Sequence, residues 1–485
     1  MKKNDLFESG ITDVTNLGAG VAKIDEPPYT VFVQGGVTGD LALLRCIKLA
    51  KNYAVARIER LIKPSPYRTD PVCPVWRRCG GCSFAHISHE YELEVKRRSI
   101  INFLRKEGFS EEEPTVHPVY TNGVVYGYRN KVQYPVSGGR VGFYANRTHD
   151  IIENDGCALQ YPVFDDILFH IKSLGIPDGV RHICMRAGGG SPPPDCDLKG
   201  SQAGRSAPVD GGKAVMLIFV VYRAGTVGKK YIEKIISEFP EITTVAENIN
   251  PDETNVIFGN KTNILCGDGY IEDTMCGLTF RISPTSFYQV NSRTAEKLYE
   301  KAAELAALED GEKLLDLFCG TGTIGLSMIK DKPGCELTGV EIVPGAVANA
   351  VDNAKINNIG NAAFVCTDAG SACPRNSDEN SNDLLCIGTG ISKNDDLLKP
   401  SARINDIDYD CIVVDPPRKG LGAELCEKLS KSTAKRIIYI SCGPDTLARD
   451  LRYFKDAGWE IGDLYPFDMF PRTGHVETVV RLSRQ

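Results

Sequence analysis

The sequence contains no apolar run long enough to cross a lipid bilayer, which excludes a helical membrane span. Its first residues, MKKNDLFESGITD, lack the apolar core of a signal peptide, so we expect a cytoplasmic location and no membrane partner. No internal repeat is found, and no obligate protein partner is evident from the sequence. A chain of 485 residues is too long for one ordinary core, and we expect two or three domains.

A strong charge of either sign is also absent. The net charge is −7, which argues weakly against a polyanionic partner. The charge is unevenly distributed, however, because residues 1–150 carry 21 Lys and Arg against 16 Asp and Glu. This asymmetry favours a nucleic-acid-binding face in the first third of the chain.

A disulfide framework is not expected, because the 17 cysteines are odd in number and irregularly spaced in a large chain. We predict that six of them are small buried apolar residues: Cys46, Cys184, Cys266, Cys335, Cys366 and Cys411. Another four form the pattern Cys73-x5-Cys79-Gly-Gly-Cys82, followed much later by Cys157. Four thiolates can hold a [4Fe–4S] cluster or a zinc ion, and their spacing alone does not decide between the two.

The hydrophobic pattern divides the chain into three predicted domains. Residues 1–62 read as short strands separated by glycines, typical of a small OB-like β-barrel. Residues 63–285 are predicted to form a central α/β domain that would contact nucleic acid, and its helix near 90–110 is predicted to pack on the C-terminal domain. Residues 286–485 show the β-α-β pattern of a doubly wound, Rossmann-like sheet. Two polar stretches, 187–212 and 370–408, are predicted to be surface insertions.

The third domain contains a glycine-rich turn typical of nucleoside cofactor sites. In DLFCGTGTIG, Gly320, Gly322 and Gly325 follow a predicted strand and precede a helix. Glu341 ends the next strand, 19 residues after Gly322, where a carboxylate can accept both ribose hydroxyls. NAD enzymes share these features. The position of the turn deep in the chain, and Asp415-Pro416-Pro417 after the fourth strand, favour S-adenosylmethionine instead.

The segment RIIYISCGP places Cys442 at the carboxyl end of a parallel strand, the edge at which open α/β sheets bind ligands. A thiolate there can add to C6 of a pyrimidine and make C5 nucleophilic. The C5 proton must afterwards be removed by a base. Glu477, in FPRTGHVETVV, is the candidate, and His475 is the alternative.

Several motifs together resemble the RNA uracil-5-methyltransferase family: SFYQVN (286–291), DLFCGTGTIG (316–325), DPPRKG (415–420), SCGP (441–444) and HVET (475–478). The resemblance implies Cys442 as nucleophile and Glu477 as proton acceptor. It also implies that Gln289, Phe318, Glu341 and Asp415 bind or position S-adenosylmethionine, and we add Gly320, Gly322 and Asp368 to this set. One departure is Gly443, where the family usually has Asn.

The resemblance also implies an RNA substrate with a flipped uracil, against which Phe287 would stack and with which Asp415 would hydrogen-bond. Arg129 and Lys131, in YGYRNKVQY, are candidate phosphate or base contacts, although a solvated strand pair explains them equally well. The cysteine pattern matches the iron–sulfur site of the ribosomal-RNA members, and the N-terminal region resembles their TRAM domain. We therefore expect a uridine of 23S ribosomal RNA as target, with the T-loop of transfer RNA as the alternative.

Three other classes remain as rivals. A cytosine-5-methyltransferase shares thiol attack at C6, but its nucleophile usually follows a Pro-Cys or Thr-Cys pattern. An RNA-binding protein with a degenerate catalytic domain would not need both Cys442 and Glu477. An NAD-dependent oxidoreductase would leave Cys442 and the DPPR motif unexplained.

Overall fold

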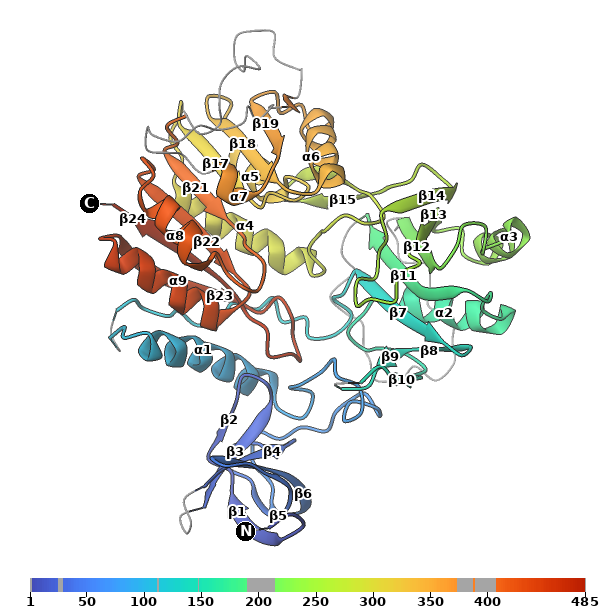
Figure 1. Ribbon diagram of the computed structural model, residues 1–485, viewed down its shortest axis with the longest axis vertical. Helices are drawn as coiled ribbons and strands as arrows, with labels where there is room; N and C mark the ends of the chain where they lie inside the picture. Colours follow the sequence, from blue (N-terminus) through green and yellow to red (C-terminus); the bar gives the residue numbers. More distant parts are fainter. Residues whose placement is uncertain are drawn as a thin grey trace.

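The computed structural model describes residues 2–24, 29–110, 113–146, 148–189, 214–372, 387–388 and 407–484. Most of the two predicted insertions, 187–212 and 370–408, lies outside these ranges. The described chain forms an N-terminal sheet, a central α/β unit and a C-terminal α/β unit (Figure 1). None of the described helices has the length and apolar character needed to cross a bilayer.

The N-terminal strands form one sheet, in the order β1-β5-β6-β4-β3-β2. Their bounds are β1 (Leu6–Gly10), β2 (Asp13–Val14), β3 (Ala19–Ile24), β4 (Tyr29–Gln34), β5 (Leu41–Leu49) and β6 (Tyr53–Lys63). Alternate residues point inward, as a period of two requires, and Val31, Val33, Ala42 and Leu44 are fully buried. The predicted strands are therefore present, while closure into a barrel stays a prediction.

The central unit is a mixed sheet in the order β14-β13-β12-β11-β7-β8. Its strands are β7 (Lys131–Ser137), β8 (Arg140–Val141), β11 (Val180–Gly188), β12 (Ala214–Val221), β13 (Ile242–Ile249) and β14 (Lys261–Cys266). Helices α2 (Pro162–Leu174) and α3 (Lys229–Glu238) pack against it through apolar residues such as Phe164 and Ile235. Two short pairs complete this region: β9 (Phe143–Tyr144) with β10 (Ile151–Ile152), and β15 (Ile271–Met275) with β16 (Leu278–Ile282).

The C-terminal unit is built on a sheet in the order β20-β19-β18-β17-β21-β22-β24-β23. The strands are β17 (Lys313–Leu317), β18 (Glu336–Glu341), β19 (Ala362–Cys366), β20 (Ile387–Gly388), β21 (Cys411–Val414), β22 (Arg436–Ser441), β23 (Glu460–Phe467) and β24 (Glu477–Ser483). The order reverses at β17, and β17 to β19, β21 and β22 are parallel. This is the doubly wound, Rossmann-like arrangement that the sequence predicts.

Helices cover both faces of this sheet. On one face, α4 (Ser292–Ala306), α5 (Thr323–Ile329) and α6 (Pro344–Ile356) share one apolar core with the sheet. On the other face lie α7 (Ala369–Ala372), α8 (Gly422–Ser430), α9 (Pro444–Asp456) and α1 (His89–Lys106). The hairpin β15–β16 contributes Ile271 and Phe280 to the first core, so the predicted boundary at residue 286 is not marked by a break in packing.

Helix α1 lies between the N-terminal sheet and the C-terminal unit (Figure 1). Ser88 caps it, because its side chain accepts a hydrogen bond from the backbone N–H of Tyr91 at 3.3 Å. Ile100 and Leu104 pack into the same core as Leu451 and Phe454 of α9. The helix also buries two charged residues, Glu92 and Lys96, on its inner face.

The burial of the cysteines agrees only in part with the sequence. Cys46, Cys184, Cys335 and Cys411 are buried as predicted. The prediction was wrong for Cys266 and Cys366, whose side chains are exposed. Each is the last residue of its strand, β14 or β19, where the chain leaves the cover of the sheet.

Candidate active site

The candidate residues follow the carboxyl ends of adjacent parallel strands. Phe318 comes directly after β17, Glu341 ends β18, Asp415 follows β21 and Cys442 follows β22. Strand β24 runs antiparallel to β22, so its first residue, Glu477, starts at the same edge. One edge of one sheet thus carries residues that are widely separated in the sequence.

The glycine turn after β17 has an open face. Gly320 and Gly322 have φ values of 54° and 81°, a left-handed conformation that favours glycine. Among the described residues, no heavy atom lies within 4 Å of a Cβ built on Gly320. A Cβ on Gly322 would approach Leu326, Ala350 and Phe364 to 3.1–3.3 Å. Gly322 therefore serves close packing, while Gly320 leaves room for a ligand beside its backbone.

Glu341 is tied to this turn. Its Oε2 accepts a hydrogen bond from the Gly320 N–H at 3.2 Å, and its Oε1 accepts one from the Val343 N–H at 2.9 Å. The carboxylate remains partly exposed and keeps lone pairs for a further partner. Asp368, after the next strand, accepts a hydrogen bond from the Ser371 N–H at 3.0 Å, so its carboxylate caps the short helix α7.

Cys442 directly follows β22, and Glu477 begins the neighbouring strand β24. The register pairs Ser441 of β22 with Thr478 of β24, and the next residues toward this edge are Cys442 and Glu477. Burial, followed by the charges of Glu477 and Asp415, raises the pKa of the Cys442 thiol to about 12. Burial and Asp415 likewise raise the pKa of Glu477. Both groups thus lie at a partly shielded sheet edge, close to the carboxylate of Asp415.

Arg418 places a positive charge close to Cys442 and Glu477. It follows Asp415-Pro416-Pro417 and lowers the pKa values of both Cys442 and Glu477 against the stronger effect of burial. Its Nη2 lies 3.2 Å from Nε2 of His475. Burial and the Arg418 charge lower the pKa of His475 to about 4, so this imidazole is neutral at pH 7. Arg418 belongs to the quoted DPPRKG motif, but the sequence reasoning assigned it no role.

Gln289 and Phe287 precede α4 and reach different environments. Gln289 is buried, and its backbone carbonyl accepts a hydrogen bond from Asn130 Nδ2 at 3.0 Å. Phe287 is 65% exposed, so its ring is available to a partner. Tyr299 of α4 has its hydroxyl 3.3 Å from Thr323 Oγ1, at the start of α5, which ties α4 to the glycine turn.

Comparisons with known proteins identify the family of this chain. A family model described as tRNA (Uracil-5-)-methyltransferase matches residues 253–485. A protein of Bacillus cereus named as an uncharacterized RNA methyltransferase is 36% identical, over 100% of this chain and 98% of its own length. A protein of Clostridium acetobutylicum with the same description is 34% identical over 100% and 98%. The chain belongs to the RNA uracil-5-methyltransferase family.

The same fold is found in a solved structure. The crystal structure of Pyrococcus abyssi tRNA (uracil-54, C5)-methyltransferase in complex with S-adenosyl-L-homocysteine matches with a TM-score of 0.70 and 23% identity. The match covers 98% of this chain and 99% of that chain. The predicted multidomain architecture with a Rossmann-like sheet is thereby confirmed at the level of the fold.

Arg129 and Lys131, the candidate RNA contacts, are both partly buried. The Arg129 Nε lies 3.4 Å from the Tyr128 hydroxyl, and its charge lowers the pKa values of Cys82 and Cys157 against their burial. Burial and Arg186 lower the pKa of Lys131 to about 8. In this structure Arg129 is a neighbour of the cysteines, and Lys131 is the first residue of β7 in the central sheet.

The predicted cysteine ligands share one neighbourhood. Burial, then Cys157 and Cys79, raise the pKa of Cys82 to about 12, with a smaller contribution from Cys73. Asn154 Nδ2 lies 3.9 Å from Cys73 Sγ. Across the part of the chain that the structure describes, no group of His, Cys, Asp or Glu side chains is arranged to hold a metal ion. The cluster therefore stays a prediction.

Proposed function

We propose that this RNA methyltransferase uses S-adenosylmethionine to methylate C5 of a uridine in 23S ribosomal RNA, giving 5-methyluridine. The observation that carries the proposal is the register of β22 and β24, which brings Cys442 and Glu477 to one sheet edge beside the glycine turn. A thiol and a carboxyl group in that relation suit covalent addition to a pyrimidine followed by proton removal.

The residues at the glycine turn fit a nucleoside cofactor. Gly320 has open space on the side where a Cβ would stand, and Glu341 presents a carboxylate that is already oriented by two backbone N–H groups. Gln289, Phe318, Gly322, Asp368 and Asp415 would complete the site. When bound there, S-adenosylmethionine supplies a methyl group to the substrate.

The chain's own residues would perform the remaining steps. The Cys442 thiolate forms a bond to C6 of the uracil, and the electron pair of the C5–C6 double bond moves into the ring carbonyl as an enolate. C5 gains the methyl group and still carries its proton. Glu477 removes this proton, the double bond forms again, and the Cys442 thiolate leaves. Phe287, with its exposed ring, would stack on the flipped uracil.

We further propose that Cys73, Cys79, Cys82 and Cys157 hold a [4Fe–4S] cluster with a structural role. The shared neighbourhood of their partly buried thiols and the adjacent Arg129 charge, which offsets thiolate charge, support this assignment. The cysteine pattern and the N-terminal sheet favour ribosomal RNA. The fold shared with a transfer-RNA enzyme favours the T-loop of transfer RNA as the alternative target.

The experiment is mass spectrometry of nucleosides from 23S ribosomal RNA and transfer RNA, each purified from cells with and without the gene. Loss of 5-methyluridine from ribosomal RNA alone is the expected result. Loss only from transfer RNA would preserve the chemistry and overturn the substrate. Unchanged 5-methyluridine in both RNAs would contradict the proposed function.

A further inference from the structure

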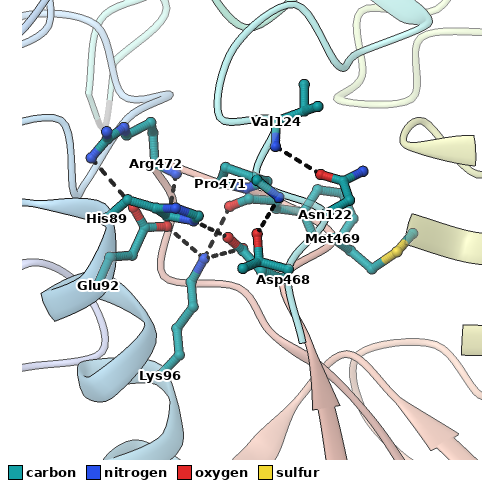
Figure 2. Close-up of polar contacts among 12 residues, drawn as sticks. His89, Glu92, Lys96, Asn122, Val124, Asp468, Met469, Pro471 and Arg472 are labelled. Carbon is teal, nitrogen blue, oxygen red and sulfur yellow. Dashed lines mark hydrogen bonds and ion pairs between the residues drawn. The ribbon is translucent and has the colours of Figure 1, made fainter. Parts of the chain in front are cut away.

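The loop formed by residues 468–476 joins β23 to β24 and ends directly before Glu477. It is held by segments from far away in the sequence. Figure 2 shows His89, Glu92 and Lys96 pointing from α1 toward Asp468 and Arg472 of this loop. The contacts are buried and carry charge, although none of these side chains belongs to the proposed chemistry.

Lys96 is the centre of these contacts. Its Nζ lies 2.6 Å from Glu92 Oε1, 2.6 Å from Asp468 Oδ1 and 3.2 Å from the Phe470 carbonyl oxygen. His89 Nε2 lies 2.8 Å from the second carboxylate oxygen of Asp468. Lys96, Glu92 and Asp468 are each at most 1% exposed. The carboxylate of Asp468 is thus fixed on both oxygens by side chains of one helix.

The same loop is held from other directions. Arg472 donates its backbone N–H to Glu92 Oε1 at 2.8 Å and a guanidinium N–H to the Ile87 carbonyl oxygen at 2.7 Å. The Tyr128 hydroxyl donates to the Pro471 carbonyl oxygen at 3.0 Å. A Cβ on Gly474 would lie 1.8 Å from the Asn16 carbonyl oxygen, so the turn between β2 and β3 contacts the loop directly.

The contacts that hold Asp468 are linked to Glu477 through Phe467 of β23. In the antiparallel pair β23–β24, Phe467 is the register partner of Glu477, and Asp468 is the next residue after Phe467. The Asp468 N–H also donates to the Tyr120 carbonyl oxygen at 2.8 Å. Fixing Asp468 therefore fixes the strand end against which Glu477 is aligned.

Stability alone does not explain a buried ionic network at this point, because apolar residues of similar volume often stabilise a protein equally well or better. Proton transfer has a stricter requirement, since the base must lie within about 2.6–3.2 Å of its proton. A displacement of about 1 Å can lower a rate about 100-fold. The network has the rigidity and the location that such alignment requires.

We propose that Lys96 and Asp468 are positioning residues for Glu477 and that they govern removal of the C5 proton rather than thiol addition. This inference rests on the proposed function. It differs from a purely structural role in one respect: weakening the network should slow one step of the reaction selectively.

The test uses the full chain with Lys96→Met and Asp468→Asn combined. The pair removes one positive and one negative charge and leaves the Glu92–Arg472 contact, at 3.6 Å between Oε2 and Nη1, in place. The substrates are transcripts of 23S ribosomal RNA and transfer RNA made with uridine or 5-deuterouridine. We expect turnover to fall about 10- to 100-fold, with an increased deuterium isotope effect and accumulation of a covalent protein–RNA adduct. S-adenosylmethionine affinity should stay unchanged.

A matched control is the double variant Arg436→Met with Glu312→Gln. This pair, with Arg436 Nη1 3.1 Å from Glu312 Oε1, lies at the other end of β22, and its loss should lower the melting temperature without adduct accumulation. If the Lys96–Asp468 variant does not fold, His89→Gln removes one contact to Asp468 and should show a smaller effect of the same kind.

The inference would be overturned if a folded Lys96–Asp468 or His89 variant showed the same adduct lifetime and the same isotope effect as the wild-type protein. It would also be overturned if the Arg436–Glu312 control showed equally large effects. Failure of the proposed function is distinguishable, because in that case neither the wild-type protein nor Glu477→Gln would methylate or trap either RNA.

Discussion

Cys442 and Glu477 stand at one end of an antiparallel strand pair, because Ser441 and Thr478 are register partners in β22 and β24. The backbone of the sheet, rather than a mobile loop, therefore sets the separation of the proposed nucleophile and the proposed base. Their charges oppose each other, since Glu477 raises the pKa of the Cys442 thiol. The two groups suit successive steps, in which the thiolate acts first and the carboxylate afterwards.

The Cys442→Ala variant should lose methylation, by on the order of 10⁴-fold or more, because no other described thiol takes this place at the sheet edge. Binding of S-adenosylmethionine should persist, since the glycine turn is unaltered. Tritium transfer from labelled S-adenosylmethionine and calorimetry would measure the two properties. Cys426→Ala, which removes a buried thiol of α8, is the control and should remain active. Full activity of Cys442→Ala would contradict covalent catalysis.

The Glu477→Gln variant should form a methylated covalent adduct that persists, because proton removal must precede departure of the thiolate. The adduct would appear on denaturing gels as a slowly migrating protein band that carries RNA. Glu460→Gln, at the start of the neighbouring strand β23, is the matched control and should turn over normally. A clean absence of adduct would count against Glu477 as the base.

The methylation rate should rise with pH. Burial and neighbouring carboxylates raise the pKa of Cys442 to about 12 and also raise that of Glu477, so both protonated forms are favoured at pH 7. The reactive thiolate and carboxylate both increase as pH rises, by up to about tenfold per pH unit for each group. Single-turnover rates from about pH 6 to about pH 9 would measure this slope. A rate that falls over this range would contradict it.

Arg418→Gln should be slower at every pH in the same experiment, because Arg418 lowers the pKa values of both Cys442 and Glu477. Its loss would also free His475, whose Nε2 lies 3.2 Å from the guanidinium. The control Arg452→Gln, an exposed residue of α9 paired with Asp456 at 2.9 Å, should leave the profile unchanged.

The convergence of Cys442 and Asp415 could be predicted from the sequence, because parallel strands place the residues that follow them at one edge. Glu477 reaches the same edge as the first residue of the antiparallel strand β24. The anchoring of the loop before Glu477 could not. Glu92 and Lys96 are spaced i, i+4, which on a sequence indicates an exposed helical ion pair. Only the tertiary structure shows that Asp468 joins them and that all three are buried.

Glu341→Gln should weaken S-adenosylmethionine binding roughly 10- to 100-fold, because a carboxylate accepts hydrogen bonds more strongly than an amide. The Gly320 N–H bond at 3.2 Å can persist with the amide oxygen, so the turn should keep its shape. Calorimetric titration would measure the affinity. Glu336→Gln, at the opposite end of β18, is the matched control. Equal affinity of Glu341→Gln and the wild-type protein would exclude Glu341 as a ligand.

Protein purified without oxygen should contain about four irons and about four sulfides per chain, if the four cysteines hold the proposed cluster. Cys82→Ala should lose most of this iron, because its thiol lies among Cys79, Cys157 and Cys73 and responds to the charge of each. Cys184→Ala removes a fully buried thiol from β11, outside this group, and should keep the iron. If the purified protein contains zinc and no iron, the four cysteines hold a mononuclear zinc site and not an iron–sulfur cluster. Wild-type protein that is free of both metals after anaerobic purification would contradict the proposed cluster.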